Sequence, residues 1–451
     1  MRQLNVLYLI PRYKTYGMTG HYVMPMGILY VSAYVKRSGI CHVHTLNLNH
    51  VDGNEYELLY DFCHRHEIDV LGVGGLSGEY EDLARMVNYG RKIKPDMYIV
   101  VGGGIVTADP TTTLKAFENA DCGVIGEGEE TSVELIMALT EQRSLSGVKG
   151  LIYRDENGLH LTERRNEIMD LDSLPFPDYE GFNYAVYLEQ NPDLSDEGKK
   201  YSQVSVIGGR SCKYNCTFCF HPSGTKYRQR SLDSIFSEID YLICQYPISY
   251  IALREELFAT DNERVRDFCR RMGKYDIDWS IQLRIDSINQ ELVDILKDTR
   301  CRYVFVGVES ADDKVLRSMH KGITRVQIEK ALYLLHQAGL NSRSGVIFGD
   351  EAETYETANN TLQWFRDNYS RYRLFVDMII SFPGSTLYRH ACQKGIIPDP
   401  VQFLKDGCPI VNVSSMSDHE FRQLVREVEK INYRKYNVKF YNNVYETAMD
   451  I

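Results

Sequence analysis

Short apolar, β-rich stretches alternate with longer amphipathic stretches through most of the chain, and this rhythm constrains the fold more than any other feature. In residues 1–146 the amphipathic stretches include residues 27–37 and 80–92, which have the length and spacing of helices. Strand–helix repeats of this kind predict a parallel sheet covered by helices on both faces. The strand candidates are residues 5–10, 43–48, 70–74, 98–101 and 122–125. We therefore expect residues 1–146 to form a doubly wound, Rossmann-like α/β domain.

Glycines follow three successive strand candidates of this first domain, where the carboxyl ends of parallel strands meet. Ligands of doubly wound sheets bind along that edge, and glycine lets a bulky ligand approach the backbone closely. The alternative is that these glycines only make tight turns between strands and helices. The candidates are Gly72, Gly74, Gly75, Gly102, Gly103, Gly104, Gly126 and Gly128.

The chain changes character over residues 147–200, which we interpret as a linker. The stretch GLIYRDENGLHL predicts a hairpin with its turn at Asn157 and Gly158, and LDSLPFPDYEGF is rich in proline and turn residues. Six further strand candidates then alternate with helical stretches, which predicts a partial (β/α)6 barrel over residues 201–400. They are residues 203–207, 249–253, 279–283, 303–308, 344–348 and 375–381. Residues 401–451 are polar and predict a helical C-terminal region.

The composition is that of an ordinary globular protein: 43% of the 451 residues are hydrophobic and 25% are charged. The net charge of −11 disfavours nucleic acid as a partner, because phosphate binding needs a concentrated basic face. No apolar run reaches the roughly 18–20 residues of a membrane span, and MRQLNVLYLIPRYK is too short for a signal peptide. Eleven cysteines, an odd number, fit reduced thiols better than a disulfide framework, so we expect a cytoplasmic protein.

Three of the cysteines stand close together, directly after the first strand candidate of the barrel. Cys212, Cys216 and Cys219 follow the spacing C-x3-C-x2-C. A structural zinc ion takes four ligands, and His221 as the fourth would make a cramped site. A chance cluster of buried cysteines is a second alternative. We favour a [4Fe–4S] cluster held by three thiolates, because its fourth iron remains open for catalysis.

This segment, SVIGGRSCKYNCTFCF, resembles the cluster-binding motif of the radical SAM superfamily. The resemblance implies that the open iron binds the amino and carboxylate groups of S-adenosylmethionine (SAM). It further implies that the reduced cluster donates an electron, and that the resulting 5′-deoxyadenosyl radical abstracts hydrogen from a substrate. Phe218, the aromatic residue before the last cysteine, is then expected to place its backbone near the adenine.

Segments on later strands also resemble this superfamily and imply further contacts to SAM. LREELF ends the second barrel strand, where an acidic residue receives the SAM amino group, and GVESADDKVLRSMHKG resembles the fourth-strand segment. FGDEAETYET departs from the usual GLPGET, because Asp350, Glu351 and Ala352 replace Leu, Pro and Gly. A solvated helix start for the two glutamates and a structural salt bridge for the arginine are the alternatives. The implied SAM ligands are Glu255, Glu256, Arg284, Glu309, Ser310 and Gly349, while FPGSTLYRHACQKGII is expected to be structural.

The first domain resembles the cobalamin-binding domain that precedes many radical SAM barrels. The matching segments are PMGILYVSAYVKRSG, VVGGGIVTADP and GVIGEGEET, together with the linker. The resemblance adds Thr107 and Glu127 to the glycines as candidate cobalamin contacts. Cobalamin carriers supply a histidine to cobalt through D-x-H-x-x-G, but Leu48 replaces the aspartate here, and we interpret His50 as a loop residue. Ile105 stands where a histidine is common in the superfamily.

Together these resemblances imply a radical SAM enzyme that acts on a small-molecule substrate, with cobalamin-dependent C-methylation as the leading hypothesis. Its cofactors are then a [4Fe–4S] cluster, SAM and cobalamin, and an external reductant such as flavodoxin or ferredoxin is its partner. The alternative is a cobalamin-independent dehydratase, epimerase or ring-rearranging enzyme on a sugar or aminoglycoside-like metabolite, with Tyr227, Arg228 or Asp377 near the substrate radical. A noncatalytic iron–sulfur sensor is a third hypothesis. No nucleic-acid or membrane partner is expected.

Overall fold

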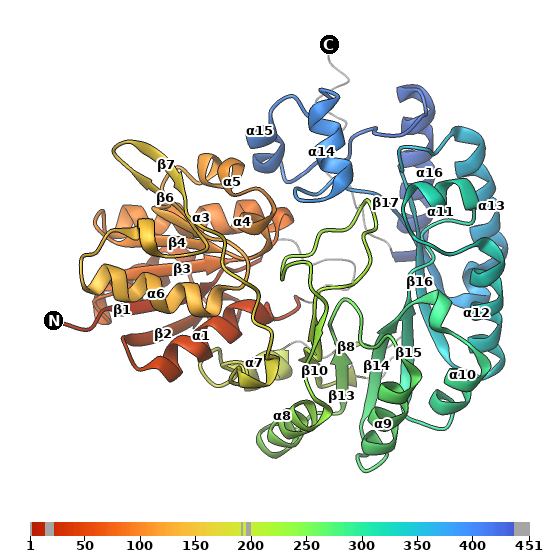
Figure 1. Ribbon diagram of the computed structural model, residues 1–451, viewed down its shortest axis with the longest axis horizontal. Helices are drawn as coiled ribbons and strands as arrows, with labels where there is room; N and C mark the ends of the chain where they lie inside the picture. Colours follow the sequence, from red (N-terminus) through yellow and green to blue (C-terminus); the bar gives the residue numbers. More distant parts are fainter. Residues whose placement is uncertain (1, 14–21, 191–192, 195–199, 437–451) are drawn as a thin grey trace. The chain divides into compact units, whose positions relative to one another are not determined.

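The computed structural model describes residues 2–13, 22–190, 193–194 and 200–436. The chain divides into two compact units, each with its own large sheet (Figure 1). Unit 1 comprises Met1–Ser202, Phe220–Arg230 and Asp399–Cys408, and unit 2 comprises Gln203–Cys219, Ser231–Pro398 and Pro409–Ile451. Residues 437–451, the end of the expected helical C-terminal region, lie outside the described residues.

Unit 1 is a doubly wound α/β domain, as its strand–helix rhythm predicts. Its seven-stranded sheet has the order β2-β1-β3-β4-β5-β6-β7, and the first five strands are parallel. The strands are β1 Asn5–Ile10, β2 His42–Asn47, β3 Val70–Gly74, β4 Tyr98–Gly102, β5 Cys122–Val124, β6 Leu151–Asp155 and β7 Gly158–Leu161. The helices are α1 Met26–Ser38, α2 Glu55–Arg65, α3 Tyr80–Ile93, α4 Gly104–Ala108, α5 Pro110–Ala116, α6 Gly128–Thr140, α7 Tyr184–Gln190 and α15 Pro400–Lys405. The strand order reverses between β1 and β3, where ligands of such sheets bind.

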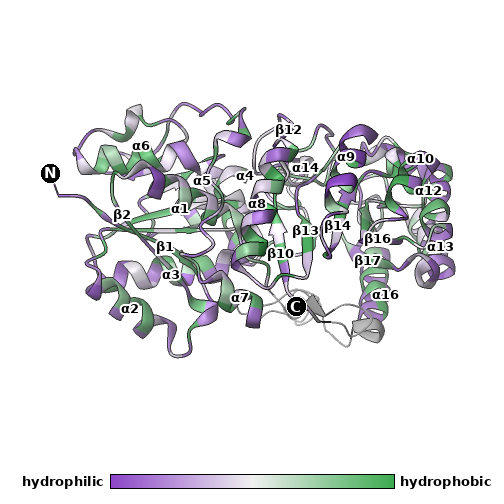
Figure 2. Ribbon diagram, turned by 90° about the horizontal axis from the view of Figure 1, so that it is seen from below, coloured by the Kyte–Doolittle hydropathy of each residue, from purple (hydrophilic) through white to green (hydrophobic). Residues whose placement is uncertain are grey.

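These elements form where the sequence predicts them because their apolar side chains repeat at the period of each element. Every residue of β1 after Asn5 is buried. In α3, Leu83, Met86 and Val87 are buried at the i, i+3, i+4 spacing of an amphipathic helix. Figure 2 shows hydrophilic and hydrophobic residues alternating in the same way along helices such as α2. Helix α1 ends at Gly39, whose φ of 66° is the left-handed conformation that favours glycine.

The hairpin expected in the linker is part of the unit 1 sheet. Strand β6 pairs antiparallel with β5, and β7 pairs antiparallel with β6. The proline-rich stretch that follows is fixed to α1, because Asp178 accepts a hydrogen bond of 2.5 Å from Ser32 and lies 2.6 Å from Lys36. The stretch after residue 147 therefore contributes two strands of the large sheet and helix α7 to unit 1.

Unit 2 is a partial barrel of six parallel strands in chain order, as predicted. The strands are β10 Gln203–Val206, β13 Tyr250–Leu253, β14 Asp278–Leu283, β15 Cys301–Val306, β16 Asn341–Phe348 and β17 Leu374–Met378. The helices are α8 Leu232–Gln245, α9 Asn262–Met272, α10 Gln290–Leu296, α11 Asp313–Ser318, α12 Arg325–Gln337, α13 Tyr355–Tyr372, α14 Thr386–Gln393 and α16 Asp418–Tyr436. The chain also has short strands β8 Asp193–Leu194, β9 Lys200–Tyr201, β11 Gly209–Arg210 and β12 Arg228–Gln229, and 3-10 turns η1 Leu48–His50, η2 Ser77–Glu79, η3 Leu145–Gly147, η4 Leu171–Ser173 and η5 Ile285–Ser287.

The parallel strands of unit 2 bring their carboxyl ends to one rim, where the active sites of barrels lie. The cysteine segment follows β10 at this rim. Glu255, Arg284 and Glu309 follow β13, β14 and β15 in the same way. The fold therefore gathers these charged side chains with the three thiols. None of the described helices has both the length and the apolar character that a membrane span requires.

Candidate functional site

The loop that carries the three cysteines is fixed at its centre by two backbone hydrogen bonds. Thr217 N donates to Met319 O at 3.1 Å, and Leu387 N donates to Thr217 O at 3.1 Å. Phe218 packs against an apolar cluster of Val315, Met319, Ile379 and Leu387. These contacts hold the loop between the ends of later strands and helices of unit 2.

The thiols of this loop are electrostatically coupled. A hydrogen bond between Cys216 and Cys219 lowers the pKa of Cys216 and raises the pKa of Cys219. The positive charges of Lys321 and Arg284 also favour the Cys216 thiolate. Burial raises the pKa of Cys212. These contacts favour ionisation of one of the thiols, and the thiolate is the form that binds iron.

The described residues contain no three His, Cys, Asp or Glu side chains that converge on one ion position. A zinc site of the three cysteines with His221 would need such convergence. The thiolates that hold a [4Fe–4S] cluster bind separate irons, so they need not converge on one point.

The two adjacent glutamates after β13 are in different environments. Glu255 is buried, with 3% of its surface exposed, and accepts a hydrogen bond of 2.9 Å from Gly208 N, just before the cysteine segment. Glu256 is half-buried, and its negative charge adds to the effect of burial in raising the pKa of Cys212. Glu256 therefore lies close enough to the thiols to act on a ligand there, while Glu255 supports the turn at Gly208.

Arg284 is held in place beside the cysteine loop. Its guanidinium carbon lies 3.6 Å from the centre of the Tyr214 ring, and its Nε donates to Asp286 at 2.9 Å. A further hydrogen bond of 2.7 Å runs to the carbonyl of Lys321. Arg284 thus makes a structural salt bridge and also places positive charge near Cys216.

The segment after β15 separates the two other candidates. Glu309 has a φ of 65°, and its Oε1 lies 2.7 Å from Lys321 Nζ. The pair adjoins Cys216, whose pKa responds to both charges. Ser310, in contrast, is fully buried and lies 3.2 Å from the hydroxyl of Thr361 in α13. Glu309 faces the thiols and Ser310 faces the helical layer.

In the turn after β16, which departs from the usual GLPGET sequence, the acidic side chains form hydrogen bonds to other residues of the protein. Glu351 accepts hydrogen bonds of 2.8 Å from His390 and 2.6 Å from Lys394. Asp350 accepts one from Ala352 N at 2.9 Å. Gly349 has a φ of 113°, and its N–H donates to Glu353 at 2.6 Å. Burial raises the pKa of Glu353 to about 8, so this carboxyl group is largely protonated near neutral pH.

The glycines at the strand ends of unit 1 differ in the space around them. Gly126 has a φ of 78°, and a Cβ placed there would meet no atom within 4 Å. A Cβ on Gly103 would lie 2.7 Å from Gly75 O, and one on Gly104 would lie 3.4 Å from Pro222. A Cβ at Gly72 would meet Tyr8 at 2.9 Å, one at Gly74 would meet Gly102 at 3.1 Å, and one at Gly128 would meet Val31 at 3.0 Å. A Cβ at Gly102 would meet Val124 only at 3.9 Å. Gly126 and Gly102 are therefore the candidates with space beside them.

Two polar candidates in these loops already have protein partners. Thr107 donates to Gly103 O at 3.0 Å and accepts from Gly126 N at 2.9 Å, so it ties two glycine-rich loops together. Glu127 lies 2.8 Å from Arg228 through both carboxylate oxygens. This pair could not be predicted from the sequence, because the residues are 101 positions apart.

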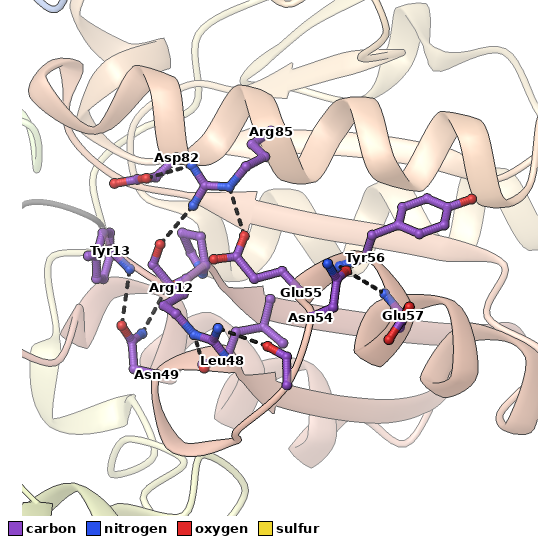
Figure 3. A network of polar contacts seen from close by, with 12 residues as sticks. Arg12, Tyr13, Leu48, Asn49, Asn54, Glu55, Tyr56, Glu57, Asp82 and Arg85 are labelled. Atoms are coloured by element: carbon purple, nitrogen blue, oxygen red, sulfur yellow. Dashed lines mark hydrogen bonds and ion pairs between the residues drawn. The ribbon is translucent and has the colours of Figure 1, made fainter.

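The loop after β2 is fixed by the polar network in Figure 3. Arg12 donates to Leu48 O at 3.1 Å, and Asn49 accepts from Tyr13 N at 3.1 Å. Arg85 links Glu55 and Asp82 to the carbonyl of Arg12, with distances of 2.7, 2.9 and 2.8 Å. His50 lies in this loop, bonded to the Tyr22 hydroxyl. Burial lowers the pKa of His50 to about 4, so the ring is neutral.

Comparison with known proteins accounts for both units. The family model of the radical SAM superfamily matches residues 206–365, and that of the B12 binding domain matches residues 17–136. The chain is a radical SAM protein with a B12-binding domain. The radical SAM match begins in β10 and includes all three cysteines and the acidic turns that follow them.

Relatives and solved structures resemble this radical SAM protein over most of its length. An uncharacterized methyltransferase of Pyrococcus horikoshii is 25% identical over 410 residues, covering 88% of this chain and 85% of the relative. The cytidylyl-2-hydroxyethylphosphonate methyltransferase of Streptomyces wedmorensis is 23% identical, covering 88% and 83%. The structure of the radical SAM methyltransferase TsrM from Kitasatospora setae has a TM-score of 0.70 at 18% identity, covering 87% and 75%. OxsB, a cobalamin-dependent radical enzyme, has a TM-score of 0.68 at 19% identity, covering 97% of this chain and 62% of its own.

The residues of the radical SAM domain fit a [4Fe–4S] cluster and SAM. Three free thiols lie in one loop, and one of them ionises readily. Glu256, Glu309 and Arg284 supply charges of both signs beside them, which suits the ammonium and carboxylate of an amino acid. In the B12-binding domain, the open space at Gly126 is where a bulky ligand can approach the backbone.

Proposed function

We propose that the protein is a cobalamin-dependent radical SAM enzyme that methylates an unreactive carbon of a small-molecule substrate. The observation that carries this proposal is the joining, in one chain, of a B12-binding domain to a radical SAM domain with three loop thiols. The Pyrococcus and Streptomyces relatives, both named as methyltransferases, support it. When bound, the cluster and SAM supply a substrate radical and cobalamin supplies the methyl group.

The chain's own residues then bind and orient these groups. Cys212, Cys216 and Cys219 hold three irons of the cluster. Glu256 accepts hydrogen bonds from the SAM amino group, and Arg284 offers positive charge to its carboxylate. Glu309, held by Lys321, is placed to contact the ribose or methionine part of SAM. Glu255 and Ser310 support the turns on which these residues stand rather than contact SAM.

The protein needs an electron donor and a reducing environment. We propose an external reductant of the flavodoxin or ferredoxin kind. We also propose a cytoplasmic location, which the odd number of eleven cysteines supports, since reduced thiols persist in that compartment.

A second candidate is the hydrogen-abstraction enzyme without cobalamin, a dehydratase, epimerase or ring-rearranging enzyme. It is favoured by one observation in unit 1: Gly103 and Gly104 face protein atoms, and Glu127 is engaged by Arg228. These residues are therefore already occupied within the fold. In this case the glycine-rich loops serve as turns only.

The fate of SAM decides between the two. Anaerobically purified protein, reconstituted with iron, sulfide and hydroxocobalamin, is incubated with SAM, a reductant and candidate small molecules. Methylation yields S-adenosylhomocysteine and 5′-deoxyadenosine in parallel, whereas the second candidate yields 5′-deoxyadenosine alone. Cobalt and iron contents measured on the same sample report cofactor binding independently of activity. Protein that takes up no cobalamin yet cleaves SAM would refute the methyltransferase proposal.

A further inference from the structure

The segment that follows the third cluster cysteine belongs to the B12-binding unit. Cys219 is the last residue of its stretch of unit 2, and Phe220–Arg230 is part of unit 1. A single peptide bond therefore separates a proposed iron ligand from a segment whose contacts are made in the other unit. The cluster loop is therefore covalently continuous with a segment that is held within unit 1.

Two sets of contacts place the segment beside the carboxyl end of β4 and beside the stretch that follows β7. Phe220 and Pro222 lie over Gly104, since a Cβ there would be 3.7 Å from the Phe220 ring and 3.4 Å from Pro222. Further along, Glu167 accepts hydrogen bonds of 2.7 Å from Thr225 N and 3.2 Å from Lys226 N. The end of β4 that this segment crosses is one of those where the B12-binding domain has its glycines.

Arg228 is the strongest of these attachments. It donates to both oxygens of Glu127 at 2.8 Å, and the two side chains are only 2% and 5% exposed. The same nitrogen, Nη1, lies 2.7 Å from the carbonyl of Ile168, while Nη2 donates to Ser223 O at 2.5 Å and Nε to Lys226 O at 2.9 Å. A buried arginine with every donor engaged has little freedom to move without breaking the whole set.

Glu127 in turn belongs to the loop with open space. It follows Gly126, where a side chain would meet nothing, and its Oε2 also accepts a hydrogen bond of 2.6 Å from Ile168 N. A ligand that occupies the space at Gly126 therefore contacts a loop whose next residue, Glu127, forms the ion pair with Arg228. This ion pair connects the loop with the segment that follows Cys219.

We propose that Arg228 is a positioning residue that couples ligand binding at the Gly126 loop to cluster binding at Cys219. The inference rests on the proposed function, in which that ligand is cobalamin. A loaded cluster restrains Cys219 and hence the segment up to Arg228, and the ion pair passes this restraint to the Gly126–Glu127 loop. By thermodynamic reciprocity, cobalamin and the cluster then stabilise each other's binding by the same factor.

The test measures cobalamin affinity with and without the cluster. Hydroxocobalamin is titrated into full-length protein, either cluster-loaded or stripped with a chelator, and binding is followed by the cobalamin visible spectrum. In the wild type we expect loss of the cluster to weaken binding on the order of fivefold or more. In Arg228→Met we expect the two dissociation constants to agree within a factor of about two.

Two further variants and a control sharpen the result. Arg228→Lys keeps the charge but loses the bonds that Nε and Nη2 make to the carbonyls of Lys226 and Ser223, so it should retain part of the coupling. Lys149→Met removes a solvent-exposed ion pair of unit 1, with Glu163 at 2.8 Å, and should leave the coupling at its wild-type value. If Arg228→Met does not fold, as judged by thermal melting, Glu127→Gln carries the same comparison.

Two results would overturn the proposed coupling. They are equal cobalamin affinities with and without the cluster in the wild type, and full coupling in the Arg228→Met or Glu127→Gln variant. Cobalamin binding that does not depend on the cluster contradicts only this inference and leaves the proposed methyltransferase function standing. No cobalamin uptake in either state contradicts the proposed function as well.

Discussion

Lys321 donates a hydrogen bond of 2.7 Å to Glu309, and both side chains are largely buried next to the thiol of Cys216. The pair sits where the backbone of Glu309 adopts a φ of 65°, an uncommon conformation for a residue with a side chain. Such backbone strain is found where a side chain must be held in one orientation. The lysine both fixes the carboxylate and supplies the charge that favours the Cys216 thiolate.

Replacing this lysine should make the Cys216 thiol less acidic. In Lys321→Met the cation is lost and the charge of Glu309 is left uncompensated, and both changes disfavour the thiolate. We expect the pKa of Cys216 to rise by roughly one unit, which leaves about tenfold less thiolate at pH values below the wild-type pKa. The rate of Cys216 alkylation by iodoacetamide in cluster-free protein, followed by mass spectrometry from pH 5 to 9, measures this. The buried Cys269 serves as an unreactive internal control, because burial raises its pKa to about 12. An unchanged pH profile for Cys216 would show that the lysine does not act on it.

Removing any one of the cluster thiols should abolish the cluster and spare the fold. In Cys212→Ala, Cys216→Ala or Cys219→Ala, we expect the visible absorbance of the thiolate-bound cluster to be lost. The melting temperature should change little, because all three cysteines lie in the loop after β10 and β11 rather than in a strand or helix of unit 2. Cys244→Ala, an exposed cysteine in α8, is the matched control and should keep the full spectrum. An active, fully loaded single variant of the three would contradict the assignment.

The two glutamates after β13 should respond differently to substitution. Glu256→Gln removes a charge-assisted contact to SAM, worth about 1.5–3 kcal/mol or about 10- to 150-fold in affinity. Glu255→Gln should lower thermal stability instead, because the carboxylate that accepts from Gly208 N is buried. Calorimetric SAM titration of both cluster-loaded variants separates the roles. Equal losses of SAM affinity would mean that the two residues act together.

Glu353 should make the protein less stable as the pH rises. Its folded-state pKa of about 8 lies above the unfolded value, so the folded protein binds the extra proton. The stabilisation is therefore complete at low pH and is lost as the pH increases through about 8. Glu353→Gln removes this titration, so its melting temperature should fall less than that of the wild type between pH 6 and 9. Parallel curves for the two proteins would exclude this carboxyl group as the source.

The glycine loops of unit 1 can be tested with two glycines that share a backbone conformation but lie in different loops. Gly126 lies in a glycine-rich loop after β5, and Gly39 ends helix α1. Gly126→Val and Gly39→Val both introduce a side chain at a positive φ, of 78° and 66°, with no atom within 4 Å. Both should lose similar stability, about 1–2 kcal/mol. Only Gly126→Val should lose cobalamin, measured by its visible spectrum after reconstitution. Gly103→Val is a poorer probe, because its side chain would collide with Gly75. Wild-type affinity in Gly126→Val would remove this loop from the ligand site.

The sequence predicted the strands and the cysteine loop because these signals are local. Strands β1 and β3 begin and end at the expected residues, since their apolar runs are bounded by polar or turn residues. It did not predict that β6 pairs with β5, because the alternating pattern of a hairpin does not indicate which other strand the hairpin will pair with. Nor could it separate Glu255 from Glu256, since the choice depends on which way the backbone turns after β13.

The way in which the chain is divided between the two units limits where it can be cut into separately folding fragments. Unit 1 is built from three stretches that are separated in sequence, and one of them supplies Arg228. A fragment that ends at residue 202 therefore lacks this arginine, and Glu127 would remain as a buried carboxylate without its cation. During synthesis, the B12-binding unit must wait for residues up to 408 before all its pieces exist. The two units are also expected to evolve together, because recombination at residue 202 would separate Glu127 from Arg228.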